Sequence, residues 1–565
     1  MKHFLTRPLS RRLGILLAPL VFAGCMVGPS YKRPSPIVSA KFKELRPAPG
    51  WNYANPSLAE LPKGAWWTLY NDPTLNTLEA QVELNNQNVK EYEARYRAAR
   101  ATINSVRAQL YPTLSGSLSF NRQSSGRGSR SSGTIVNYGS NTSSGVASNS
   151  TENTYGMGPT ASWDLDLWGK IRRQIQAQVT ETQATAADLA NAKLSYQAQL
   201  ATAYFNMRYQ DSLYDLLQRN VKFYERSYEI THNQYEAGTA DPTALLQAKT
   251  QLEQTRAQAT ATQASRAQYE HAIAVLIGKP PAEVSIAPGS LTNTIPAIPV
   301  SVPAQLLERR PDVAAAERRM EEYNAQIGAA IAAFYPDVKL TASYSYSGDP
   351  VGTLVQVANR IWSLGASATE TLFSGGSRTA AVHEADANYD NYVATYRQTV
   401  LTALQGVEDQ LSNLRILAQQ ADQQRVALEA ANRAVTVAFN QYMAGTQIYT
   451  TVITSQVTAL SNAQTALQIQ QNRILDSVTL IQNLGGGWNV SALPSKGSMQ
   501  TDNPFLPSLS RKIKTFCPVT AKPNRRFSIK KASALLSGQR LFCRLFKSRP
   551  SGLFHKCAPC QQGNN

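Results

Sequence analysis

The chain has 565 residues and a formal net charge of +18 at pH 7, from 56 basic and 38 acidic side chains. The excess is confined to the two ends, because residues 1–24 hold four basic and no acidic side chains, and residues 491–565 hold fourteen and one. The remaining body has 38 basic and 37 acidic residues, so its charge gives no reason to expect nucleic-acid binding. Its single cysteine, Cys25, excludes a structural disulfide there.

Residues 1–24 predict an export signal. Basic residues precede the apolar run Leu13–Ala23, which is too short to span a bilayer by the usual ~20-residue criterion. Cys25 follows Ala23-Gly24 directly. One interpretation is an ordinary signal peptide with a chance cysteine. The other, which we favour, resembles a bacterial lipoprotein signal, in which Cys25 carries lipid and begins the mature chain. Residues 25–64 are rich in proline and predict an extended, lipid-anchored tether.

A long helix is expected to follow the tether. Asp72 has the position of an N-cap and Pro73 that of the first helical residue. No glycine or proline then interrupts the chain from Thr74 to Tyr111, which predicts one unbroken helix of about 57 Å. A helix of this length is expected to pack along a neighbouring helix.

The chain then changes from helical to strand periodicity at a Tyr-Pro step, and it does so twice. After Tyr111-Pro112 and again after Tyr335-Pro336, apolar residues occupy every second position, with serines and threonines between them. Proline removes a backbone donor and disfavours helical geometry in the preceding residue, so each switch belongs at this step. The two steps are 224 positions apart. The sequence therefore predicts two copies of a helix–strand unit.

Each copy is expected to contain a second strand. Residues 163–170 alternate in the first copy, and residues 366–378 are their counterpart in the second. Residues 123–154, rich in Ser, Gly and Asn, predict a loop between the first two strands. Strands with one apolar and one hydroxyl-rich face indicate a membrane barrel with lipid outside and water inside. Because four strands cannot close such a barrel, several chains must combine.

Long helices and their returning partners complete each copy. Lys170–Ala237 and Thr243–Ile277 are free of internal glycine, and the second long helix ends before a return helix at Thr446–Leu484. Both long helices end in the pattern Asn-Gln-Tyr-x-Ala-Gly-Thr, and its two copies are 207 positions apart. A glycine here permits the left-handed geometry that ends a helix.

The predicted domains are therefore a signal peptide (1–24), a tether (25–64), two repeats (65–280 and 304–490) joined by a proline-rich crossing (281–303), and a tail (491–565). The tail is basic and lacks lasting periodicity, so we expect it to be disordered, and a read-through or frame-shifted extension is our leading explanation. Its Cys557-Ala-Pro-Cys560 has the spacing of a redox or zinc motif but lacks a second ligand pair.

No catalytic site is predicted. The five histidines are scattered and none has a metal-ligand spacing, and no phosphate-binding glycine loop occurs. Carboxylates on the long helices are typical of solvated faces. We therefore expect no enzyme activity, no cofactor and no metal site.

Taken together, these features resemble the TolC-like outer-membrane efflux family, in its lipoprotein (NodT-like) branch. The motifs that carry the resemblance are Met26-Val-Gly-Pro-Ser-Tyr31, Trp66-Trp67 with Asp72-Pro73, Arg309-Arg310-Pro311-Asp312, and both Tyr-Pro and Ala-Gly-Thr pairs. The resemblance implies a mainly α fold with β: a homotrimeric outer-membrane β-barrel, four strands per chain and twelve in total, continuous with a long periplasmic α-helical barrel. It also implies a periplasmic adaptor and an inner-membrane RND-type transporter as partners, and no nucleic acid.

The expected function is the outer-membrane exit duct of a tripartite efflux pump, which conducts drugs or other small molecules passively. A type I protein secretion duct is one alternative. A lipid-anchored structural coiled-coil protein is another, but an adhesive protein has no need of alternating strands beside its coils. The expected location is the cell outer membrane, with a lipid anchor and an extension into the periplasm.

The resemblance also points to functional residues. Two turns are expected at the periplasmic tip, where the family meets its adaptor: Ala237, Gly238 and Thr239, and Ala444, Gly445 and Thr446. In much of the family, inward carboxylates follow the second turn and narrow the closed end. The matching positions here are Thr451 and Thr454, and Gln447 stands where some relatives have Asp, which predicts a neutral gate. Asp241 is the nearest acid to the first turn and is also a candidate cap for the return helix.

Overall fold

The computed structural model describes residues 26–35, 38–39, 41–44, 64–124, 151–292, 294–296, 298, 303 and 308–499. The predicted export signal and the lipidation site Cys25 lie outside these residues, as does the tail from residue 500 onward. The expectation that this part of the tail is disordered therefore stays a prediction.

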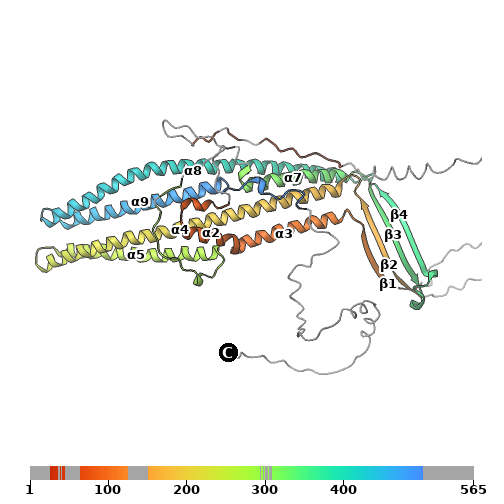
Figure 1. Cartoon of the computed structure of the whole chain (residues 1–565), viewed down its shortest axis with the longest axis horizontal. Helices are drawn as coiled ribbons and strands as arrows, with labels where there is room; N and C mark the ends of the chain where they lie inside the picture. The colour runs from red at the N-terminus through yellow and green to blue at the C-terminus, as the bar shows by residue number, and fades with distance from the viewer. Residues whose placement is uncertain are drawn as a thin grey trace, which may run out of the picture. The chain divides into compact units, whose positions relative to one another are not determined.

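Two copies of one helix–strand unit make up the fold (Figure 1). In the first copy, the short helix η2 (Trp66–Tyr70) precedes the elements α2 (Pro73–Asn85), α3 (Gln87–Ala108), β1 (Thr113–Ser124), β2 (Thr151–Leu165), α4 (Lys170–Glu236) and α5 (Pro242–Leu276). The second contains α7 (Pro311–Ala332), β3 (Asp337–Gly348), β4 (Arg360–Thr369), α8 (Ser377–Met443) and α9 (Tyr449–Asn483). Short 3₁₀ turns connect them: η3 (Pro281–Glu283), η4 (Val351–Thr353), η5 (Val357–Asn359) and η6 (Val490–Ala492).

Element lengths confirm the duplication. The helices before the sheet, α3 and α7, both have 22 residues, and the strands that follow, β1 and β3, both have 12. The long helices α4 and α8 both have 67 residues, and their returning partners α5 and α9 both have 35. Each long helix and its partner form an antiparallel hairpin (Figure 1). No helix in the described ranges combines the length and the hydropathy needed to cross a membrane.

The prediction of one unbroken helix from Thr74 to Tyr111 is wrong. Asp72 caps α2 as expected, but the helix ends at Asn85 and α3 begins at Gln87. Between them, the Asn86 side chain accepts hydrogen bonds from the backbone N–H groups of Asn88 and Val89. It also donates to the Leu276 carbonyl at 2.8 Å. An N-cap that is anchored in a distant helix explains the break, because Asn satisfies free helix-start donors better than it continues a helix.

The strand boundaries also differ from the prediction. Gln123 and Ser124 belong to β1 and residues 151–154 to β2, so the predicted loop 123–154 is shorter at both ends. The fourth strand ends at Thr369, opposite Asp337 at the start of β3, and does not run to Arg378. Gly375 and Gly376 take positive φ in the turn before α8.

The largest core lies where α2, α4 and α9 meet. Trp66, Tyr204 and Phe205 are fully buried in it, together with Leu75 and Ile481. Burial of such large side chains is the main force that holds the helices together. The core lies between the sheet and the hairpin turns, and it fixes the two hairpins to one another.

The described chain packs beyond the predicted end of the second repeat. Met499 is buried against Ile103 and Val179, and the Lys496 ammonium lies 2.7 Å from a carboxylate oxygen of Glu321. The first nine residues of the predicted tail therefore belong to the folded body, which corrects the boundary at residue 491.

The tether is extended and bound along its described length. The Arg173 side chain donates to the carbonyls of Val27 and Gly28, each at 2.9 Å. Farther along, the Glu408 carboxylate accepts from the backbone N–H groups of Lys43 and Glu44. The tether therefore follows the helices from α4 to α8.

Candidate functional site

The four strands form one antiparallel sheet in the order β1-β2-β3-β4, with mostly apolar side chains on one face and mostly hydroxyl side chains on the other. Directly opposed residues point to the same side of an antiparallel sheet, so the register assigns each side chain to a face. One face carries Leu114, Leu118, Phe120, Tyr155, Met157, Ala161, Trp163, Leu165, Val338, Leu340, Ala342, Tyr344, Trp362, Leu364, Ala366 and Ala368. The other carries Thr113, Ser115, Ser117, Ser119, Thr160, Ser162, Thr341, Ser343, Ser345, Ser363, Ser367 and Thr369. This is the alternation that the sequence predicts.

Hydroxyl groups on the polar face bond to the sheet itself. Ser115, Ser117 and Ser119 donate to carbonyls of β2, and the Ser343 and Ser363 hydroxyls lie 2.8 Å apart. The charged residues Lys339 and Asp164 pair with each other at 3.6 Å on this face. A wall rich in hydroxyl groups suits a water-filled lumen.

Aromatic rings mark both ends of the apolar face. At the helix end, Trp163 donates to the Leu110 carbonyl, and Trp168 donates to that of Pro336 while its ring stacks on Tyr335. At the other end, the rings of Phe120 and Tyr155 are 4.9 Å apart. Two aromatic girdles around an apolar band are typical of strands that cross a bilayer.

Within the described residues of the single chain, both edges of the sheet are open. β1 and β4 each have a strand neighbour on one side only, so their outer N–H and C=O groups lack sheet partners. Such edges cannot face lipid, where no water satisfies them. The sheet is therefore complete only when the edges of other chains pair with it.

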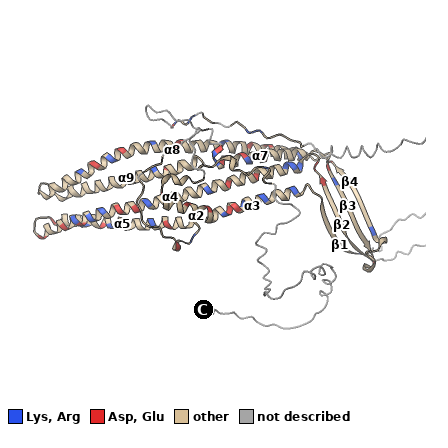
Figure 2. Ribbon diagram, in the orientation of Figure 1, with Lys and Arg blue, Asp and Glu red and all other residues tan. Residues whose placement is uncertain are grey.

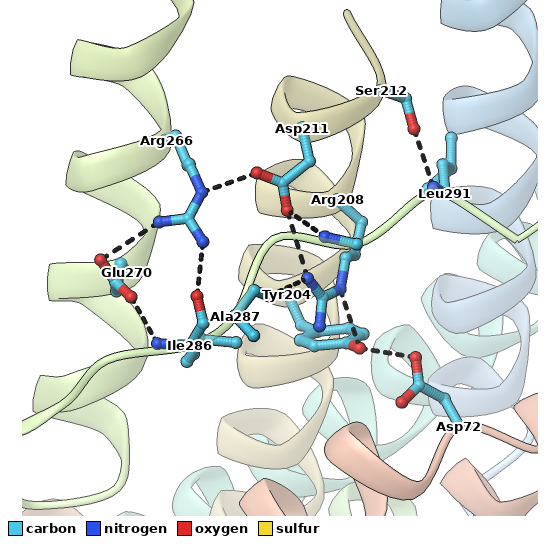
Figure 3. Close-up of polar contacts among 11 residues, drawn as sticks. Asp72, Tyr204, Arg208, Asp211, Ser212, Arg266, Glu270, Ile286, Ala287 and Leu291 are labelled. Carbon is cyan, nitrogen blue, oxygen red and sulfur yellow. Dashed lines mark hydrogen bonds and ion pairs between the residues drawn. The ribbon is translucent and has the colours of Figure 1, made fainter. Parts of the chain in front are cut away.

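A polar network fixes the middle of the molecule, and the sequence analysis missed it (Figure 3). Asp211 on α4 is almost fully buried and accepts from Arg208 at 3.2 Å, Arg266 at 2.6 Å and the Gly289 N–H at 3.1 Å. Arg208 and Arg266 also donate to the carbonyls of Ala287 and Ile286. The network ties the segment after η3 to both helices of the first hairpin. Its charges are mutually satisfied, which indicates a structural role.

The same network reaches the start of α2. Tyr204 accepts from the Arg208 guanidinium and donates to a carboxylate oxygen of Asp72 at 2.5 Å. Burial, and then the hydrogen bond to Asp72, raise the pKa of Tyr204 to about 12. Asp72 therefore acts twice, since its other oxygen caps α2. No local pattern in the sequence reveals these contacts, which join residues far apart in the chain.

Both Ala-Gly-Thr turns lie at the ends of the hairpins away from the sheet (Figure 1). Gly238 and Gly445 both have φ of +71°, as the sequence predicts for helix-ending glycines. The N–H and hydroxyl of Thr239 both bond to the Gln234 carbonyl, and those of Thr446 bond to Gln441 in the same way. Turn geometry thus explains the Gly and Thr positions, while all six residues of the two turns remain exposed.

The candidate gate residues lie at the start of α9. Thr451 is half-buried, and its hydroxyl is 3.3 Å from the Gln447 side-chain oxygen. Thr454 is exposed and donates to the Thr451 carbonyl. Asp241 caps α5 by accepting from the Thr243 hydroxyl and N–H, and these bonds hold the pKa of Asp241 below its usual range. Its role as a cap is therefore confirmed.

Charge separates the two hairpin tips. Residues 222–256 of the first hairpin contain nine Asp, Glu, Lys or Arg residues, whereas residues 434–472 of the second contain none. Figure 2 shows the contrast, with the distal part of α9 uncoloured beside the coloured α4 and α5. An exposed helix face in water normally carries charges. An exposed face without them is suited to approach copies of itself.

Two carboxylates with raised pKa values, the buried Glu79 and the half-buried Glu322, are further features that the sequence analysis missed. Glu79 on α2 is fully buried, and neither of its carboxylate oxygens has a partner within the described part of the chain. Burial holds the pKa of Glu79 well above its usual range. On α7, burial and then the neighbouring Glu181 raise the pKa of Glu322 to about 8. The described residues contain no cluster of side chains that could hold a metal ion.

Comparison with known proteins gives the same picture. The probable efflux pump outer membrane protein TtgC of Pseudomonas putida is 27% identical over 478 residues, which cover 84% of this chain and 95% of TtgC. The cation efflux system protein CusC of Escherichia coli is 26% identical, with 83% and 97% covered. The probable outer membrane lipoprotein SilC of Salmonella typhimurium is 25% identical over 83% of this chain and 97% of its own.

Solved structures share the fold. The outer-membrane channel OprN superposes with a TM-score of 0.72 at 27% identity and covers 82% of this chain and 100% of its own. The Campylobacter jejuni CmeC outer membrane channel superposes with a TM-score of 0.74 at 22% identity over 85% of this chain and 100% of its own. The model of the family described as "Outer membrane efflux protein" matches residues 78–279 and 302–486. The chain belongs to the outer membrane efflux protein family.

Proposed function

We propose that three copies of this chain form the outer-membrane exit duct of a tripartite efflux pump and conduct small molecules passively. The observation that carries this proposal is the four-stranded sheet, apolar on one face and hydroxyl-lined on the other, with both edges open. Only a closed ring of such sheets satisfies the edges and encloses water.

The number of chains follows from the size of the lumen. Two copies would give eight strands, and side chains fill the interior of a barrel of that size. Three copies would give twelve strands and leave room for a water-filled passage. The long hairpins would extend this passage into the periplasm.

The cargo and the partners follow from the family. Relatives are named for the efflux of antibiotics, toluene, solvents and cations, a range that suggests that the pump, and not the duct, selects the substrate. An inner-membrane RND-type transporter and a periplasmic adaptor would supply the cargo, and the adaptor would dock on the exposed turns at Gly238 and Gly445. These relatives favour efflux over the alternative of type I protein secretion.

Lipid on Cys25 would anchor each chain beside the barrel. An ideal Cβ at Gly169 would lie 2.8 Å from the Met26 side chain, so the residue after Cys25 packs at the junction of β2 and α4. Palmitate labelling should disappear in Cys25→Ala, while the barrel should still insert, because lipid adds affinity but builds no strands. Labelling that survives the substitution would remove the anchor from the proposal.

Single-channel recording tests the duct. Purified full-length protein should behave as a trimer and give discrete conductance steps in planar bilayers. A host that lacks its own efflux duct should regain drug resistance when this chain is supplied with its transporter and adaptor. Stable trimers that never conduct would favour the structural coiled-coil alternative.

A further inference from the structure

Two arginines lie at the end of the sheet away from the helices, on the face that carries mostly apolar side chains. Arg122 lies in β1 two residues after Phe120, and Arg360 begins β4 two residues before Trp362. Strand side chains alternate, so each arginine shares the face of its aromatic neighbour. The register agrees, because Arg360 opposes Tyr346 and Trp362 opposes Tyr344. Both arginines are exposed.

The position of these arginines relative to the membrane follows from the girdle. Phe120 and Trp362 are the aromatic residues of β1 and β4 on this face, and each arginine lies one same-face position beyond the aromatic residue of its own strand, toward the end away from the helices. Arginines that follow an aromatic girdle on a lipid-facing surface reach into the headgroup layer with their guanidinium groups. Because the helices leave the opposite end of the sheet, this layer belongs to the outer leaflet.

Closure of the barrel would place the two arginines on one seam between neighbouring chains. Each chain has β1 at one edge and β4 at the other, so a ring of sheets must pair β4 with the partner subunit's β1. β1 runs toward the loop end of the sheet and β4 runs away from it, which makes this pairing antiparallel. Arg360 then lies at the same end of the seam as the partner subunit's Arg122. The seam is incomplete in a single chain.

No acidic side chain neutralises this pair in the part of the chain that the structure describes, where neither arginine forms an ion pair. A guanidinium that faces lipid without a carboxylate partner is suited to a planar, multiply charged oxygen anion.

We propose that Arg360 and the partner subunit's Arg122 bind a phosphate-bearing lipid headgroup of the outer leaflet, at three equivalent seams around the barrel. The arginines point to the lipid side, which favours a headgroup over a permeating anion. The hydroxyl face is the one that would meet cargo. The inference rests on the proposed function for the trimeric barrel, and its test separates the two.

The experiment uses the full-length trimer in detergent, titrated with lipid A that carries two phosphates. Native mass spectrometry counts the lipids bound, and the thermal midpoint of the trimer reports stabilisation. Dephosphorylated lipid A and phosphatidylcholine serve as lipids without the anionic headgroup, and inorganic phosphate serves as the free anion. We expect up to three tightly bound lipid A molecules per trimer and little effect from the other three probes.

The variants assign this binding to the seam. Arg122→Gln with Arg360→Gln should weaken the affinity for lipid A by roughly thirtyfold, from the usual contribution of two basic residues at a membrane surface. The double variant Arg122→Lys and Arg360→Lys should retain most of the affinity for lipid A. The control Arg226→Gln removes one positive charge from an exposed part of α4 far along the chain and should leave the affinity unchanged.

Several outcomes would overturn the proposal. Equal binding of phosphorylated and dephosphorylated lipid A would show that the headgroup is not recognised, and unchanged binding in the double Gln variant would place recognition elsewhere. Equal stabilisation by inorganic phosphate would indicate an anion site without lipid. If the double variant does not assemble, the comparison of lipids on the unmodified trimer and on the single variants decides. A conducting trimer that binds phosphorylated and dephosphorylated lipid A equally refutes only this inference. Failure to form a conducting trimer refutes the proposed function.

Discussion

The hydroxyl of Tyr449, the first residue of α9, lies 2.9 Å from the hydroxyl of Ser227 on α4, and both residues are buried. The second hairpin is thereby fastened to the first behind the exposed turns. Tyr442 adds a second link, because its hydroxyl donates to the side-chain oxygen of Gln234. These contacts join the two hairpins close to their turns.

Loss of this buried bond should destabilise the tip. Tyr449→Phe removes one hydroxyl and leaves Ser227 with its partner missing, so we expect a loss of about 1 kcal/mol in the free energy of unfolding. Urea unfolding of Tyr449→Phe, Ser227→Ala and the double variant measures the coupling between the two hydroxyls. Single losses that simply add in the double variant would show that the bond contributes nothing.

The glycines of the two turns should be required because of their backbone conformation, and not because a larger side chain would clash with neighbouring atoms. Gly238 and Gly445 have positive φ, and an added Cβ would meet nothing within 4 Å in either case. A valine therefore adds only backbone strain, about 1–2 kcal/mol, and alters the turn while trimers persist. We expect Gly238→Val and Gly445→Val to abolish drug resistance in a susceptibility assay of cells that carry the complete pump.

The matched controls are Gly238→Asn and Gly445→Asn. Asparagine tolerates left-handed geometry, so these variants should keep most of the resistance. If both valine variants conferred the resistance of the unmodified chain, the adaptor would not dock on these turns.

The parts of this fold that the sequence predicts depend on signals between residues close together in the chain. The Tyr111-Pro112 step, the glycines that end α4 and α8, and the Asp72 cap all act within a few residues, and the structure confirms each. The alternation that assigns two faces to the sheet is equally local. These features gave the repeat, the hairpins and the membrane strands.

Features that depend on distant partners were missed. Asn86 breaks a helix because it also bonds to Leu276, and Arg266 finds Asp211 only after α4 and α5 pack. The polar start of β2 at residues 151–154 lacks alternation, yet pairing with β1 makes it a strand. The same distinction applies to the candidate site. The two turns are predictable from local sequence, whereas the burial of Glu79 depends on residues far away in the chain.

Glu79 should make the protein less stable as the pH rises. Its pKa in the folded state lies well above its unfolded value, so the folded state binds the proton more tightly. Stability is therefore greatest below the unfolded pKa and falls as the pH rises from there toward the folded pKa. Glu79→Gln removes this dependence. As the pH rises through this window, the free energy of unfolding of Glu79→Gln should therefore increase relative to that of the unmodified protein, by at most about 1.4 kcal/mol per pH unit.

Thermal midpoints of both proteins between pH 5 and pH 8 measure the effect, at roughly one-unit steps across the range where a raised carboxyl pKa acts. Glu83→Gln is the control, because Glu83 lies on the same helix but is more than half exposed and pairs with Lys193 at 2.8 Å. Removal of the Glu83 charge should change the thermal midpoint little at any pH. Parallel curves for Glu79→Gln and the unmodified protein would show that folding does not raise the pKa of Glu79.

The gate prediction concerns the uncharged tip of the second hairpin. Thr454 is exposed on α9, one turn beyond Thr451, within a stretch of 39 residues that contains no charge. If three such helices approach around a common axis, neutral hydroxyls impose no like-charge repulsion and offer no site for divalent cations. The unmodified channel should therefore conduct with little block by periplasmic divalent or hexammine cations in single-channel recordings.

Thr454→Asp in each of three chains should place a ring of carboxylates at the constriction and create block by these cations from the periplasmic side. Thr450→Asp is the control, because the Thr450 hydroxyl bonds to Gln247 on α5 and so faces the neighbouring hairpin. It should conduct without block. Strong block of the unmodified channel would contradict a neutral gate at Thr451 and Thr454. Asp241, whose carboxylate is exposed beside the first turn, would then be the residue to replace with Asn, and relief of the block would assign the acidic ring to it.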